Sequence, residues 1–166
     1  MIRLAALWAP LLGAAFGTCG CRDSLPSSPG PPERLARTSC ETLLPSAAAR
    51  AVLTHPVSYR ETRQRGGPYE SISCENRSLR ADEVFAFDVG CGVGARERFV
   101  SAIRVISRAI RQTEPRVGDE AWASDNVYLS WFAKKNCHLT VLLSWSRPHP
   151  ERLREIAGLL ARSLPP

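Results

Sequence analysis

The sequence predicts an α+β domain: an antiparallel sheet of about five strands, with helices packed on one face and disulfides stabilising the fold. Three observations lead to this class. Segments with helical and strand periodicity follow the order α-β-β-β-α-β-β-α, so the strands come in runs. Two strand segments near the C-terminal end are joined by a three-residue turn, as in a hairpin. Four cysteines are distributed through these elements.

The first predicted elements are two short helices. Residues 40–44 form one helical turn that stops before Pro45. Ser46 then caps a second helix over residues 47–53, which Pro56 terminates.

Three strands are expected next. Residues 57–62 and 69–75 have strand composition and are joined by a turn rich in arginine and glycine. Residues 84–91 alternate, with Phe85, Phe87, Val89 and Cys91 on one side and Ala86 and Asp88 on the other. This alternation predicts a strand with one buried face.

The strongest helical pattern covers residues 95–112. The apolar residues at helical spacing are Phe99, Ala102, Ile103, Ile106 and Ile110. Arg104, Arg108 and Arg111 fall on the opposite face, so we expect them to be exposed. They form a possible contact for an anionic surface, with a solvated helix face as the alternative.

A loop, a hairpin and a last helix complete the predicted domain. Gly118 to Trp122 lies in the loop, where Asp119 and Trp122 are possible partner contacts. Residues 127–133 and 137–145 form the hairpin. Residues 150–164 form an amphipathic helix whose inward residues are Leu153, Ile156, Ala157 and Leu160.

The strand periodicity also indicates a disulfide pattern. Cys91 is in phase with the apolar side of its strand, and Cys137 is in phase with Leu139, Val141 and Leu143. If both sides face one core, Cys91 pairs with Cys137 and Cys40 pairs with Cys74. Four cysteines allow three connectivities, and the sequence leaves the other two open.

The first 20 residues have the pattern of a lipoprotein signal peptide. One arginine precedes the apolar run 4–16, which is shorter than the ~20 residues of a membrane-spanning helix. Gly20 before Cys21 favours Cys21 as the lipidated residue, with Cys19 as the alternative. Lipidation of Cys21 leaves an even number of cysteines, whereas lipidation of Cys19 leaves one unpaired. A plain signal peptide and a soluble secreted protein are the other possibility.

The predicted domain organisation follows from these segments. Residues 21–39 form a tether rich in proline and serine, and residues 40–166 form a single domain. The expected location is the cell membrane or outer membrane, lipid-anchored and facing the periplasm or exterior. The net charge of +6 is compatible with anionic surfaces, and no feature predicts a nucleic-acid partner.

One segment resembles a cofactor motif. Asp88 to Gly94 reads DVGCGVG, similar to the first motif of S-adenosylmethionine methyltransferases. Those folds need an acidic residue at the end of a second strand about 20 residues on, and no acid lies between Glu97 and Glu114. A methyltransferase is therefore a remote alternative. No metal site, cofactor or complete catalytic constellation is predicted, because the three histidines are scattered and no CxxC pair occurs.

Several of these features together resemble a known group. They are the lipobox, the tether, the Cys-x-x-Leu-Leu pattern at residues 40–44, Cys74 after a strand, and the GDEAW segment before a hairpin. The chain is similar to small exported lipoproteins of actinobacterial type, whose function is unknown and whose domain is similar to extracellular sensor modules of some receptor kinases. The resemblance covers residues 40–164. It implies an α+β fold, a disulfide near the N-terminal end, and no established catalytic residues.

The sequence thus leads to a functional hypothesis. The chain is expected to be a membrane-anchored, non-catalytic binding or interaction module at the cell envelope, with an envelope protein or a small ligand as its partner. The alternative is a soluble secreted or structural envelope protein without a ligand pocket.

Overall fold

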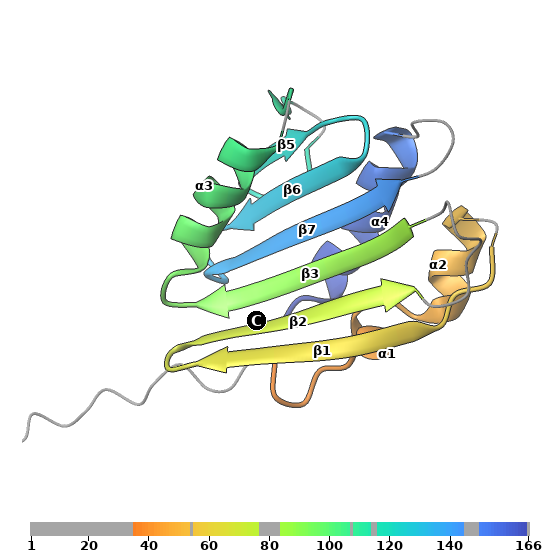
Figure 1. The fold of residues 1–166 in the computed structure, drawn as a ribbon, viewed down its shortest axis with the longest axis horizontal. Coiled ribbons are helices and arrows are strands. Elements are labelled where there is room, and N and C mark those ends of the chain that lie inside the picture. Colours follow the sequence, from red (N-terminus) through yellow and green to blue (C-terminus); the bar gives the residue numbers. More distant parts are fainter. Residues whose placement is uncertain are drawn as a thin grey trace, which may run out of the picture.

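The computed structural model describes residues 35–53, 55–76, 84–106, 108–113, 116–144 and 150–165. Its centre is one seven-stranded antiparallel sheet with the strand order β1-β2-β3-β7-β6-β5-β4 (Figure 1). The α+β class and the antiparallel sheet are confirmed. The sheet is wider than expected because two short strands, β4 and β5, extend it beyond the hairpin.

The elements have the following bounds. The strands are β1 (Tyr59–Gly66), β2 (Tyr69–Asn76), β3 (Val84–Gly92), β4 (Ile110–Arg111), β5 (Glu120–Ala123), β6 (Val127–Phe132) and β7 (Cys137–Ser144). The helices are α1 (Cys40–Leu43), α2 (Ser46–Leu53), α3 (Ala95–Val105) and α4 (Pro150–Ser163).

One face of the sheet, called here the covered face, packs against α1, α2 and α4. Phe85, Phe87 and Val89 of β3 are buried there, together with the corresponding alternate residues of β7. The four inward residues expected on the last helix are all buried: Leu153, Ile156, Ala157 and Leu160. The apolar residues that alternate along the strands and those at helical spacing on α4 therefore pack into a single core.

Helix α3 lies on the opposite side of the sheet, so the helices are not confined to one face. Phe99 is fully buried, and its ring lies 6.2 Å from that of Trp131 on β6. Trp131 pairs in register with His138, which alternates with the core-facing residues of β7. In Figure 1, α3 is drawn across one end of the strands, whereas α4 lies behind them.

The helix expected over residues 95–112 is shorter than predicted. It ends at Val105, Ile106 adopts extended backbone angles, and Arg108 has a φ of 60°. Ile110 then pairs with Ala123 in the sheet and is 68% exposed instead of buried. β-Branched residues such as isoleucine suit strands as well as helices, so apolar spacing alone did not reveal the change of structure.

The GDEAW segment is also different from the expected loop. Its last three residues enter β5, where Glu120 pairs with Trp131 and Trp122 pairs with Leu129. Gly118, with a φ of 87°, precedes the strand, and an added Cβ there would lie 2.7 Å from the carbonyl oxygen of Trp131. Glycine at this position therefore permits the close approach of the chain to β6.

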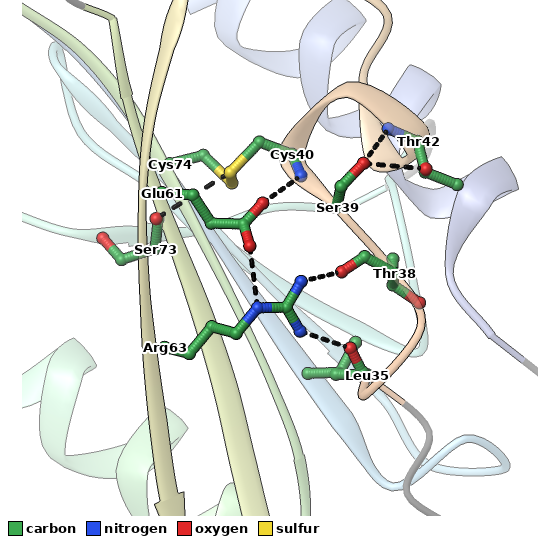
Figure 2. Close-up of a disulfide and its surroundings, with 9 residues drawn as sticks. All are labelled: Leu35, Thr38, Ser39, Cys40, Thr42, Glu61, Arg63, Ser73 and Cys74. Atoms are coloured by element: carbon green, nitrogen blue, oxygen red, sulfur yellow. Dashed lines mark hydrogen bonds and ion pairs between the residues drawn. A yellow bond between two sulfur atoms is a disulfide. The ribbon is translucent and has the colours of Figure 1, made fainter.

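The Cys40–Cys74 disulfide joins α1 to β2 and is confirmed (Figure 2). Around it, the β1 side chains hold the segment that leads into α1. Glu61 accepts the N–H of Cys40 at 2.9 Å and pairs with Arg63 at 2.7 Å. Arg63 also donates to the carbonyl oxygens of Leu35 and Thr38. Because Leu35 is only 2% exposed, the folded unit includes residues before the predicted start at residue 40.

The Cys91–Cys137 disulfide crosslinks β3 and β7 and is also confirmed. The two cysteines are paired in register, and both are buried on the covered face. The phase of Cys91 and Cys137 in the sequence therefore predicted the correct layer. In the chain-entropy account, the loop it closes corresponds to about 4 kcal/mol of stabilisation.

Candidate functional site

The face of the sheet opposite the covered face carries a group of polar side chains. In register, Ser73 of β2 pairs with Asp88 of β3, which pairs with Thr140 of β7. Ser71 lies two residues along β2 from Ser73, so all four side chains share one side of the strands. We call this group the polar face. Each of the four residues is partly exposed.

No described helix covers the polar face over its central strands. Among the described residues, α3 packs at the end near Trp131, and the other three helices lie on the covered face. In Figure 1, α4 lies behind the sheet, so the viewer looks at the side of β2, β3 and β7 that carries the polar face. These strands therefore present hydroxyl and carboxyl groups on a broad surface.

Asp88 is the ionisable group at the centre of the polar face. Partial burial raises the pKa of its carboxyl, and a hydrogen bond with the Ser73 side chain acts in the opposite direction. A carboxyl in this position can accept hydrogen bonds as the anion or donate one as the acid. The surrounding serine and threonine hydroxyls can also donate and accept. The polar face is thus suited to ligands that carry hydroxyl or amide groups.

A buried tyrosine–histidine pair borders the polar face. Tyr69 of β2 reaches across β3, and its hydroxyl lies 3.1 Å from Nε2 of His138 on β7. The two side chains are 7% and 9% exposed. Between them lies Gly90, where an added Cβ would come within 2.2 Å of the Tyr69 hydroxyl and 2.4 Å of His138 Nε2. Glycine at this position is therefore required for the contact.

The charge state of this pair follows from its surroundings. Burial, with a smaller contribution from Arg98, lowers the pKa of His138 to about 4, so the imidazole is neutral at pH 7. Burial also raises the pKa of Tyr69. The Arg98 guanidinium lies 4.3 Å from the centre of the Tyr69 ring, in a cation–π arrangement. The pair is a neutral hydrogen-bonded unit under the end of α3.

Trp122, a residue singled out in the sequence, lies on β5 beside α3. Its indole N–H donates to Glu120 Oε1 at 2.9 Å, and Glu120 Oε2 pairs with Arg96 at 2.6 Å. The hydrogen bond from Trp122, followed by the interactions with Arg96, lowers the pKa of Glu120. The Arg96 guanidinium also lies over the rings of Phe99 and Trp131, 5.0 and 5.3 Å from their centres. This cluster joins α3 to the sheet, so the indole N–H of Trp122 already has a partner.

Asp119 has a local structural partner as well. Its Oδ2 accepts the N–H of Ala133 at 2.7 Å, and its own N–H donates to the carbonyl of Trp131 at 2.8 Å. The carboxylate of Asp119 and the indole N–H of Trp122 therefore both have hydrogen-bond partners within the domain.

The three arginines expected on one helix face lie on different elements. Arg104 is in α3, Arg108 is in the turn that follows, and Arg111 is in β4. All three remain exposed, as expected. Of the three, Arg108 lines a groove of about 910 Å³. Its apolar lining includes Ile106, Ile110, Ala123, Val127 and Leu142.

The glycine segment Asp88 to Gly94 does not fit the nucleotide cofactor of the methyltransferase motif. Its strand is antiparallel to both neighbours, whereas the motif requires a parallel β-α-β unit. The space above Gly90 is occupied by Tyr69 and His138. At Gly92, with a φ of 101°, the Pro68 carbonyl oxygen would lie 2.0 Å from an added Cβ. Gly90 and Gly92 therefore permit close packing of the chain.

Other expectations fall outside the described residues or concern the whole chain. The signal segment, Cys19, Cys21 and the tether before Leu35 lie outside the described part. Within the described part, no helix is long and apolar enough to cross a membrane, and no cluster of potential metal ligands occurs. The two disulfides indicate an oxidising, extracytoplasmic environment.

Comparisons of the chain with models of protein families, with curated proteins and with solved structures gave no match. Sequence reasoning did not identify the polar face. A signal was present, since Asp88 alternates with the buried phenylalanines of its strand, but the pairing of Ser73, Asp88 and Thr140 needed the register of three strands.

Proposed function

We propose that this protein is a lipid-anchored, extracytoplasmic binding module that holds a polar ligand or partner on the polar face of its sheet. The observation that supports this most directly is the row of Ser73, Asp88 and Thr140, uncovered by any described helix. A buried polar surface without partners is unfavourable, so a face of this kind suits contact with water or with a hydrogen-bonding ligand.

The chemistry of the polar face favours binding over catalysis. His138 is the nearby imidazole, but it is buried, neutral and already in contact with Tyr69. A general base works best with a pKa near the working pH and with access to the substrate. The ligand class we infer is an uncharged molecule rich in hydroxyl or amide groups, such as an oligosaccharide or a short peptide.

The anchoring half of the proposal rests on the N-terminal pattern and on the oxidised cysteines. A lipid on Cys21 leaves Cys40, Cys74, Cys91 and Cys137, which form the two disulfides. Cys21→Ser should release the protein from membranes, because acyl chains contribute ~0.8 kcal/mol for each buried methylene. Mass spectrometry of the intact protein should find the lipid on Cys21. Release by Cys19→Ser alone would assign the lipid to Cys19, and retention of both single variants would contradict lipidation.

The binding half is tested by a thermal-shift screen of the full chain against neutral oligosaccharides and short peptides. A ligand of the folded state raises the melting temperature by mass action. The shift should be lost in Asp88→Ala and retained in the matched variant Asp125→Ala, which alters an exposed aspartate outside the polar face. The absence of any shift across the screen, or equal shifts in both variants, would favour the alternative of an envelope protein without a ligand site.

A further inference from the structure

The connection between α3 and β4 forms an exposed corner of the molecule, here called the basic–apolar corner and comprising residues 104–106 and 108–111. Val105 is 82% exposed and Ile110 is 68% exposed. Among the large apolar side chains of the described residues, these two are the most exposed. Two such side chains within one short segment present an apolar surface to water, which is a common property of interaction sites.

The same corner is strongly positive. Arg104, Arg108 and Arg111 are all exposed, and the described residues between 104 and 113 contain no acidic side chain. The adjoining groove adds one carboxylate, that of Asp125. The corner thus combines three cations with two exposed apolar side chains. Ile110 and Arg111 are successive residues of the edge strand β4, so their side chains flank its open edge on opposite sides. One further carboxylate, that of Glu120, is near enough to Arg111 to interact with it electrostatically.

We propose that the basic–apolar corner binds the surface of an anionic lipid bilayer. Arginines near such a surface are attracted to the negative headgroups, and apolar side chains gain by entering the boundary between headgroups and acyl chains. A soluble polyanion would satisfy the arginines but would leave Val105 and Ile110 in water. The bilayer therefore accounts for both parts of the corner.

The position of the corner is compatible with an N-terminal anchor but does not depend on one. β4 and β1 are the two edge strands of the sheet, and Leu35, the first described residue, accepts a hydrogen bond from Arg63 of β1. Seven strands span about 29 Å. The 14 residues from Cys21 to Leu35 reach at most about 50 Å when extended. A lipid on Cys21 and the basic–apolar corner can therefore contact the same membrane. The corner would then be a second membrane contact of the protein, in addition to the proposed lipid anchor.

The test is amide hydrogen exchange of the full chain, mixed with vesicles of phosphatidylcholine alone or of phosphatidylcholine with phosphatidylglycerol. Because the N-terminal segment is the same in both mixtures, the comparison isolates the effect of lipid charge. We expect slower exchange in peptides covering residues 104–113 on the anionic vesicles only, and loss of this slowing at high salt.

Two variants and a matched control separate the contributions. Arg104→Ser with Arg111→Ser should raise the anionic-lipid concentration needed for half of the slowing about thirtyfold, or roughly fivefold for each arginine. Val105→Ser with Ile110→Ser should also weaken the effect. The control, Arg60→Ser with Val93→Ser, removes an exposed arginine and an exposed valine elsewhere and should behave as the wild type.

Three outcomes would overturn the proposal. They are equal exchange on both kinds of vesicle, an equal loss in the control, and slowing by a soluble polyanion such as heparin that persists in Val105→Ser with Ile110→Ser. None of these outcomes bears on lipidation of Cys21 or on the polar face, so failure here is distinguishable from failure of the proposed function.

Discussion

The two faces of the same strands have opposite surroundings. On β7, Val141 is fully buried against the helices, whereas the preceding residue, Thr140, is partly exposed on the polar face. On β3, Phe87 is fully buried and Asp88 follows it on the other side. Because successive strand residues point to opposite faces, one set of strands supplies both an apolar core and a polar surface. The covered face forms the apolar core, and the polar face is where we propose that a ligand binds.

The largest effect is expected from a substitution on the covered face. Phe87→Ala removes a fully buried ring and should lower the free energy of unfolding by about 4 kcal/mol, from lost apolar burial and the cavity left behind. Thr140→Ala, on the polar face, should change it by less than about 1 kcal/mol. Urea denaturation of both variants measures the difference. Equal losses would mean that the two faces are not distinct in burial.

The next largest effect is expected from His138, whose imidazole is buried beside the polar face under the end of α3. The pKa of His138 is lowered to about 4, so the unfolded chain binds the proton more readily. The free energy of unfolding should therefore fall as the pH decreases from about 6.5 toward 4, by about 3 kcal/mol in total. The measurement is denaturant unfolding across this pH range.

Asp88 provides a control for this pH dependence, because its pKa is shifted in the direction opposite to that of His138. The raised pKa of Asp88 means that the folded state binds this proton more tightly, so the contribution of Asp88 to stability rises as the pH falls toward 3.8 and partly offsets the loss from His138. His138→Gln should therefore remove the loss of stability below pH 6.5, and Asp88→Asn should make it steeper near the acid end. An unchanged pH profile in His138→Gln would show that another group titrates.

A smaller effect tests the packing of the Tyr69–His138 pair that borders the polar face. Gly90→Ala places a methyl group against the Tyr69 hydroxyl and His138 Nε2, so these side chains must move apart. We expect a loss of about 2 kcal/mol in the free energy of unfolding. Gly66→Ala is the matched control, because no atom lies within 4 Å of its added Cβ. If both variants unfold alike, the contact across Gly90 is not a constraint on the fold.

The sequence allowed most of the covered face to be predicted, for identifiable physical reasons. Alternation in β3 and helical spacing in α4 are direct consequences of burial on one side, and they placed Phe87 and Leu160 correctly. The phase of Cys91 and Cys137 gave the right disulfide, because paired strands bring in-phase residues to one layer.

The rest depended on contacts between distant segments. Ile110 fits a helical spacing, yet it belongs to β4 because β5 supplies its hydrogen-bonding partner. Tyr69 and His138 meet only when β2, β3 and β7 are aligned, and neither residue has a local signal for the contact. The polar face was not predicted for the same reason: its members come from three strands, and polar residues at single positions normally indicate only exposure.

The central claim is that the polar face is an open binding surface, and Thr140→Arg tests it most directly. The measurement is the thermal shift of this variant, with and without any oligosaccharide or peptide that stabilises the wild type. We expect a melting temperature close to that of the wild type without ligand, because an arginine at a partly exposed position can extend into solvent. We also expect the ligand-induced shift to be lost, since the arginine obstructs the surface, and to be retained in Thr140→Ser. A melting temperature lowered as far as in Phe87→Ala, or a ligand-induced shift that is unchanged, would contradict the account.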